Sequence, residues 1–169
     1  PKAGSQRSSQ LHPVDARIRE VLNQKGLEPG EPAAPTILLR RLYLDLTGLL
    51  PSPDQWSRHL DMLSRGNVHS VVDQILASPH FGERWARHWL DQARYADSLG
   101  YEKDSVKKDA WQYRDWVVQA FNADMPFDRF SALQLAGDLI DPENPQALLA
   151  TKIHLQTQFN LEGGIDAEE

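Results

Sequence analysis

Residues of the kinds that bind ligands or transfer protons are concentrated between positions 81 and 104. This stretch, FGERWARHWLDQARYADSLGYEKD, holds one histidine, three arginines, five carboxylates and two of the five tryptophans. It contains acid–base and binding groups, but the chain has no Gly-rich phosphate loop, no G-x-S-x-G sequence and no H-E-x-x-H sequence. The stretch therefore indicates binding or proton-transfer chemistry without specifying a reaction.

A helix that turns by about 100° per residue would separate the first part of this stretch into a polar face and an apolar face. The polar face carries Arg87, His88, Asp91, Arg94 and Tyr95. Asp91 lies four residues after Arg87 and three before Arg94, so it is predicted to pair with either arginine. His88 is the best candidate for proton transfer, because Asp91 can orient its ring. The alternative for His88 is a surface histidine in an ion-pair network.

Asp97 falls on the apolar face, near the predicted end of this helix. A buried carboxylate without a partner is very costly, so Asp97 is expected to cap a backbone group or to pair with an arginine. Arg114 falls on the apolar face of the next predicted helix, Ala110 to about Ala123. We expect Asp97 and Arg114 to form an ion pair that fixes the register of the two helices. The alternative for Asp97 is a functional carboxylate in a cleft.

A long polar loop is predicted near residues 98–109, and Tyr101, Glu102 and Asp104 lie on it. The spacing of its carboxylates does not fit a calcium loop, so a solvated acidic loop is expected and no metal site is predicted. The catalytic candidates are His88, Asp91, Asp97 and Glu102. The binding candidates are Arg87, His88, Asp91, Arg94, Tyr95, Tyr101, Arg114 and Glu162.

The tryptophans and the carboxylates each allow a second interpretation. Tryptophans on apolar helix faces are expected to be buried in the core, although tryptophans also form sugar platforms and partner sites. This expectation covers Trp85, Trp89, Trp111 and Trp116. Paired carboxylates can hydrolyse glycosides, so a carbohydrate-active enzyme is a competing hypothesis.

Composition and charge exclude several classes of protein. The chain of 169 residues has 40% hydrophobic and 25% charged residues, as an ordinary globular domain does. Its net charge of −6 argues against a nucleic-acid binder. The absence of cysteine excludes disulfides, thiolate metal sites, a cysteine nucleophile and c-type haem attachment within this segment. No apolar run approaches the roughly 18 residues of a membrane span.

The apolar residues recur at helical spacing, and no segment alternates as a strand would. Pro13 and Pro53 are predicted to begin helices, and Gly26, Gly48 and Gly66 are predicted to end them. The sequence therefore predicts an all-α fold of about seven or eight helices. It also predicts one domain over residues 12–169, a disordered leader over residues 1–11, and a larger parent chain from which this domain comes.

Several motifs resemble one family, the planctomycete cytochrome-associated domain of unknown function. They are HPVD at 12–15, LLRRLYLDLTGLLP at 38–51, SPHFGERWARHWLD at 78–91, RYADS at 94–98, GYEKD at 100–104, WQYRDW at 111–116, DMPFD at 124–128, QLAGDL at 134–139 and EGGID at 162–166. One departure is Lys152-Ile-His154, where members often carry a Gly-Phe pair. Members usually lie in large exported proteins, between a cytochrome-c-like domain and a second uncharacterised domain.

The resemblance implies an extracytoplasmic protein with haem c in a neighbouring domain and none in this segment. The expected partners are adjacent domains of the parent chain, with carbohydrate as a further possibility and nucleic acid excluded. The first functional hypothesis is an accessory module that binds a ligand or a partner through a polar cleft. The alternatives are a carbohydrate-active or other hydrolytic enzyme, and a purely structural spacer.

Overall fold

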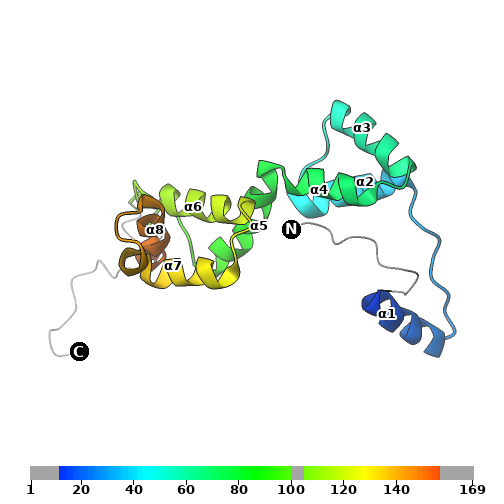
Figure 1. Ribbon diagram of the computed structural model, residues 1–169, viewed down its shortest axis with the longest axis horizontal. Helices are drawn as coiled ribbons and strands as arrows, with labels where there is room; N and C mark the ends of the chain where they lie inside the picture. The colour runs from blue at the N-terminus through cyan, green and yellow to red at the C-terminus, as the bar shows by residue number, and fades with distance from the viewer. Residues whose placement is uncertain (1–11, 100–104, 157–169) are drawn as a thin grey trace. The chain divides into compact units, whose positions relative to one another are not determined.

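The computed structural model of this protein describes residues 12–99 and 105–156. Within these ranges the chain forms eight α-helices, one 3-10 helix and an isolated β-bridge between Ser98 and Val106 (Figure 1). The predicted all-α fold class is therefore confirmed. The chain divides into two compact units, Pro1–Asp45 with Leu49–Gln74, and Leu46–Gly48 with Ile75–Glu169. The predicted leader lies outside the described residues, and the predicted extent of the domain, 12–169, stays a prediction.

Prolines begin five of the helices, which fits a residue that has no N–H to donate and a φ already preset for a helix. These helices are α1 (Pro13–Gln24), α2 (Pro35–Thr47), α3 (Pro53–Ser64), α5 (Pro79–Gln92) and α8 (Pro145–Ala150). The others are α4 (Val68–Leu76), α6 (Ala110–Asn122), α7 (Phe127–Ile140) and the 3-10 helix η1 (Thr151–Gln156). Gly26 and Gly66 follow α1 and α3 in the left-handed conformation, with φ of 64° and 81°, as predicted for helix ends.

The first unit holds a buried polar contact among its helices. His59 of α3 is 4% exposed, and its Nδ1 lies 3.0 Å from the Tyr43 hydroxyl of α2. Its Nε2 lies 3.1 Å from Oε1 of Gln74 on α4. An amide oxygen only accepts, so Nε2 donates to it. One histidine therefore ties three helices of this unit together.

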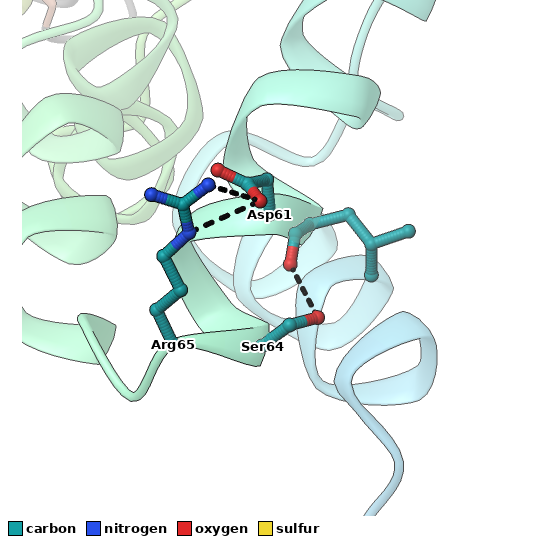
Figure 2. A network of polar contacts seen from close by, with 4 residues as sticks. Asp61, Ser64 and Arg65 are labelled. Carbon is teal, nitrogen blue, oxygen red and sulfur yellow. Dashed lines mark hydrogen bonds and ion pairs between the residues drawn. The ribbon is translucent and has the colours of Figure 1, made fainter.

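The end of α3 carries an exposed ion pair (Figure 2). Nε and Nη2 of Arg65 lie 3.2 and 3.0 Å from the same carboxylate oxygen of Asp61. The Ser64 hydroxyl donates to the Leu60 carbonyl at 2.8 Å. An exposed pair four residues apart contributes about 0.3–0.5 kcal/mol, so Arg65 is a suitable control site for mutagenesis.

The second unit contains α5, α6, α7 and α8, which lie beside one another (Figure 1). A single cluster of buried residues joins α5, α6, α7 and α8, with Tyr113, Trp116 and Val117 of α6 among its members. The ring of Trp116 stacks on Phe130 of α7, with centroids 5.3 Å apart. This cluster positions the helices that line the candidate site.

The predicted burial of four tryptophans is correct for one and wrong for two. Trp116 is 3% exposed, whereas Trp85 and Trp111 are 38% and 48% exposed. Trp89 is part-buried, and its indole N–H donates to Gln134 Oε1 at 2.9 Å and to the Tyr113 hydroxyl at 3.1 Å. The wheel placed Trp111 inward because α6 is apolar around most of its circumference and only part of that surface meets a neighbour.

The last helical segment of the described chain consists of two short parts. α8 ends at Ala150, and the chain continues as η1 to Gln156. α8 comes very close to α7, since a Cβ on Gly137 would lie 2.2 Å from the Ala147 carbonyl oxygen.

None of the described helices has the length and apolar character that a bilayer crossing requires.

Candidate functional site

The site begins where α5 ends, earlier than the sequence predicts. After Gln92 the chain reverses through Arg94, whose φ is 56°. The Tyr95 N–H donates to the Leu90 carbonyl at 2.9 Å, and the Arg94 N–H donates to the Asp91 carbonyl at 3.3 Å. This pair of bonds is a Schellman turn, with an arginine in the left-handed position that glycine usually occupies. The turn places Tyr95 after the last residue of α5 and brings it back alongside the helix.

α5 and α6 form the walls of the site and approach closely at Gly82. A Cβ on Gly82 would lie 2.5 Å from the Val118 carbonyl oxygen of α6. The Gly82 N–H donates to Oδ1 of Asn122 at 2.8 Å, and Nδ2 of Asn122 donates to the Pro79 carbonyl at 3.1 Å. The Asn122 side chain therefore holds the first turn of α5 against α6.

Further along the two helices lies a polar cleft of about 590 Å³, here called the α5–α6 cleft. Its walls carry charged and hydroxyl groups over a few apolar side chains. They are formed by Glu83, Arg87, Leu90, Asp91, Tyr95, Arg114, Asp115, Val118 and Gln119. Four of the predicted site residues, Arg87, Asp91, Tyr95 and Arg114, are thus brought together.

The charged groups of the cleft form pairs. Arg87 Nε lies 3.9 Å from Asp91 Oδ2, one of the two pairings predicted for Asp91. Arg114 turns its guanidinium to the adjacent Asp115, with Nε and Nη2 each 3.0 Å from Oδ1. A guanidinium has five N–H donors, so those not engaged with Asp115 can serve a ligand.

The predicted ion pair between Asp97 and Arg114 is wrong. Because α5 ends at Gln92, Asp97 is not on a helix face, and it is exposed. Its carboxylate accepts a hydrogen bond from the Tyr95 hydroxyl. Its backbone carbonyl accepts from the Lys107 N–H at 2.8 Å, across the connection to α6. Asp97 therefore contacts the cleft through the Tyr95 hydroxyl, and its charge also acts on Arg114.

Two groups of the cleft, the Tyr95 hydroxyl and the Arg114 guanidinium, have raised pKa values. Burial, the hydrogen bond to Asp97 and the charge of that carboxylate raise the pKa of Tyr95 to about 12. Burial lowers the pKa of Arg114, but the hydrogen bond to Asp115 and the charges of Tyr95, Asp115 and Asp97 together outweigh burial, and the net pKa is raised. At neutral pH the cleft therefore presents a neutral phenol that donates a hydrogen bond and a permanent cation.

The remaining candidates lie apart from the cleft or outside the described residues. His88 is exposed, and its ring packs against Trp85 with centroids 5.5 Å apart, so Asp91 does not orient it as predicted. Arg94 is exposed at the Schellman turn. Tyr101, Glu102 and Glu162 lie outside the described residues. In the ranges 12–99 and 105–156, no three histidine or carboxylate side chains gather as metal ligands would.

Three polar residues of the cleft, Glu83, Asp115 and Gln119, are not among the residues predicted from the sequence. Glu83 precedes Arg87 by four residues, as Arg87 precedes Asp91, and this four-residue spacing was a usable signal for one helix face. Asp115 and Gln119 of α6 also lie four apart. Their place opposite α5 depends on how the two helices pack, which a single-helix wheel does not contain.

Comparison with known proteins adds the family. No curated protein and no solved structure matches the chain. The PSCyt2 family, described as a protein of unknown function (DUF1549), matches over residues 13–169. The match begins with the first residue of α1 and covers all the described helices. The chain therefore belongs to the PSCyt2 family.

Proposed function

We propose that this chain is a helical module that recognises a polar ligand or a neighbouring domain through the α5–α6 cleft. The observation that carries the proposal is the gathering of two guanidinium groups, three carboxylates, a phenol and an amide around one cavity of about 590 Å³. Such a set offers hydrogen-bond donors and acceptors side by side. It suits a ligand that is rich in hydroxyl or carboxylate groups, and carbohydrate is the class that fits best.

Recognition is favoured over catalysis because each cleft carboxylate already has a side-chain partner. Glu83 lies 2.8 Å from Nδ1 of His80, Asp91 pairs with Arg87, and Asp115 pairs with Arg114. Paired groups of this kind fix side-chain directions, as a binding surface requires. A general acid or base would instead need a position open to the reacting atom of a substrate.

We further propose that the parent protein is exported and contains haem c in a domain next to this one. Two things support this: the family's name, which suggests a cytochrome, and the motif resemblance to planctomycete cytochrome-associated domains. The adjacent domains would then be partners of the module. Absorbance of the reduced pyridine haemochrome of the full gene product tests the haem, and detection of the protein outside the cytoplasm tests export. A full-length product without haem, or one retained in the cytoplasm, contradicts this part.

A thermal-shift screen tests the recognition proposal. The chain is heated with neutral sugars, sugar acids, oligosaccharides and metal salts, each at millimolar concentration. We expect sugars or sugar acids to raise the melting temperature, and we expect Arg114→Gln to abolish the rise while Arg65→Gln retains it. Two results together would contradict the proposal. One is that no sugar class raises the melting temperature. The other is that the amides of α5 and α6 exchange hydrogen no more slowly within the parent protein than in this chain alone.

A hydrolytic enzyme is the second candidate, and one observation favours it: three carboxylates line the cleft, with Asp97 bonded to Tyr95 next to them. Two carboxylates flanking a glycosidic bond suffice for its hydrolysis. The test is release of reducing ends from polysaccharides by the wild type and by Asp91→Asn and Asp97→Asn. Turnover that both substitutions remove would establish the enzyme, and turnover absent from the wild type excludes it for the substrates tried.

A further inference from the structure

A second cavity lies in the same unit and differs in chemistry from the α5–α6 cleft. It has a volume of about 320 Å³ and is here called the aromatic pocket. Aromatic side chains from α5, α6 and α7 form most of its walls, and two non-aromatic residues of the turn that joins α6 to α7 complete them. The lining residues are Phe81, Trp89, Ala120, Phe121, Asp124, Met125, Phe127 and Phe130.

The rings of the aromatic pocket stand nearly perpendicular to one another. Trp89 makes angles of 78° with Phe127 and 75° with Phe130, at centroid distances of 6.4 and 4.9 Å. Phe121 meets Phe130 at 78° and 5.9 Å. A cavity with walls of this kind is bordered by ring faces in several directions, and ring faces carry negative potential.

The indole N–H of Trp89 forms its hydrogen bonds within the core. Its N–H donates to Gln134 Oε1 and to the Tyr113 hydroxyl. These bonds fix the indole plane, so the ring contributes its apolar surface to the pocket. Phe127 is 71% exposed, although it belongs to the same wall, and such an exposed ring at the mouth of a cavity is available to a ligand.

A carboxylate completes the pocket. Among the described residues that line it, Asp124 alone carries a charge. Asp124 occupies the left-handed position after α6 with φ of 49°, and the Met125 N–H closes the turn by donating to the Ala120 carbonyl at 3.0 Å. Left-handed backbone at a residue other than glycine costs free energy, and such strain concentrates at functional positions.

We propose that the aromatic pocket binds an organic ammonium cation, such as a quaternary trimethylammonium group. Ring faces attract a cation, and they do so most strongly when its charge is spread over methyl groups and lightly hydrated. A carboxylate beside the rings also attracts a cation. An inorganic cation would need several oxygen ligands, and an anion would be repelled by both the rings and Asp124.

The test compares choline with 3,3-dimethylbutan-1-ol, which has the same shape and no charge. Binding of each to the full chain is measured by titration calorimetry, with the NMR signal of the Trp89 indole N–H as the local report. We expect choline to shift this signal and to bind about tenfold more tightly than the neutral alcohol, as a desolvated cation–π contact predicts. Equal affinities for choline and the neutral alcohol, or no binding of choline at millimolar concentration, would overturn the proposal. Either result would do so without any measurement on variants.

Variants then separate charge from shape. Asp124→Asn keeps a residue that tolerates left-handed backbone, and Phe127→Leu keeps an apolar side chain without a ring face. Both should weaken choline binding about fivefold or more while leaving the neutral alcohol unaffected, since each removes part of the attraction for a cation. Asp138→Asn, an exposed carboxylate of α7 outside the pocket, serves as the matched control and should change nothing. Unchanged choline affinity in both pocket variants also contradicts the proposal.

Discussion

Individual residues in the second unit are held by a polar network inside an aromatic core. The Tyr113 hydroxyl donates to Gln134 Oε1 at 2.7 Å, and Trp89 donates to both groups. The Gln134 amide N–H donates to the Phe130 carbonyl at 3.0 Å, so both ends of this amide are used. Gln134 is 2% exposed, and it carries the acceptor that both aromatic donors need.

Replacing Gln134 is therefore expected to cost more than replacing its partner. Gln134→Leu leaves buried donors without their acceptor, and we predict a loss of about 1–3 kcal/mol in the free energy of unfolding. Tyr113→Phe leaves the Trp89 N–H bonded to Gln134, so a loss of about 1 kcal/mol is predicted. Urea unfolding followed by circular dichroism measures both values. The network assignment fails if Tyr113→Phe proves the costlier change.

Tyr95 gives a prediction for alkaline solution. Its pKa is 10.0 in the unfolded chain and about 12 in the folded protein, so between these values the folded state binds more protons. Stability from this group is complete below pH 10 and is lost as the pH rises through 12. We therefore predict that unfolding free energy falls less steeply from pH 10 to 12 in Tyr95→Phe than in the wild type. Parallel slopes would show that burial and Asp97 do not raise the pKa of Tyr95 in the folded protein.

At the scale of helices, the crossing of α5 and α6 depends on Gly82. Because an added Cβ would lie 2.5 Å from a backbone oxygen, Gly82→Ala must push the helices apart. We predict a loss of about 1–3 kcal/mol in the free energy of unfolding, the usual cost of overpacking. Gly30→Ala is the matched control, since nothing lies within 4 Å of its added Cβ and it should be neutral. Equal melting temperatures for the two variants would contradict the close crossing.

Many of the helix boundaries could be predicted from the sequence, because prolines, glycines and apolar spacing act on the local backbone. Pro13 and Pro53 begin helices and Gly26 and Gly66 follow them, as predicted. The end of α5 was misplaced because the reversal occurs at Arg94, a residue with no intrinsic preference for left-handed backbone. Every error about Asp97 follows from that one misplaced end.

The pairing of charges in the site was predictable only where both partners lie on a single helix. Arg87 and Asp91 share a face of α5, and the four-residue spacing indicated their pairing. The choice of Asp115 over Asp97 by Arg114 depends on tertiary packing and could not be inferred from two separate wheels. The aromatic pocket also escaped notice, because Phe81, Phe121 and Phe127 come from three different helices.

At the scale of the molecule, the second unit contains its own core. The buried residues of its cluster all lie between Ala86 and Ala150. We therefore predict that a fragment beginning at Ile75 keeps the helices α5 to α8. Circular dichroism should show high helicity with a cooperative melting transition, since a packed core unfolds as a unit. A helical fragment that melts without cooperativity would show that the cluster does not suffice.

The central claim is that the α5–α6 cleft is the recognition surface of this protein. The most direct measurement is an amide chemical-shift map of the ¹⁵N-labelled chain, recorded with whichever sugar or sugar acid raises its melting temperature most. We predict the largest shifts at Arg87, Asp91, Tyr95 and Arg114, which are among the residues that line the cleft. We also predict that Arg114→Gln abolishes these shifts and that Arg65→Gln preserves them. Shifts confined to the first unit, or shifts that persist unchanged in Arg114→Gln, would contradict the claim.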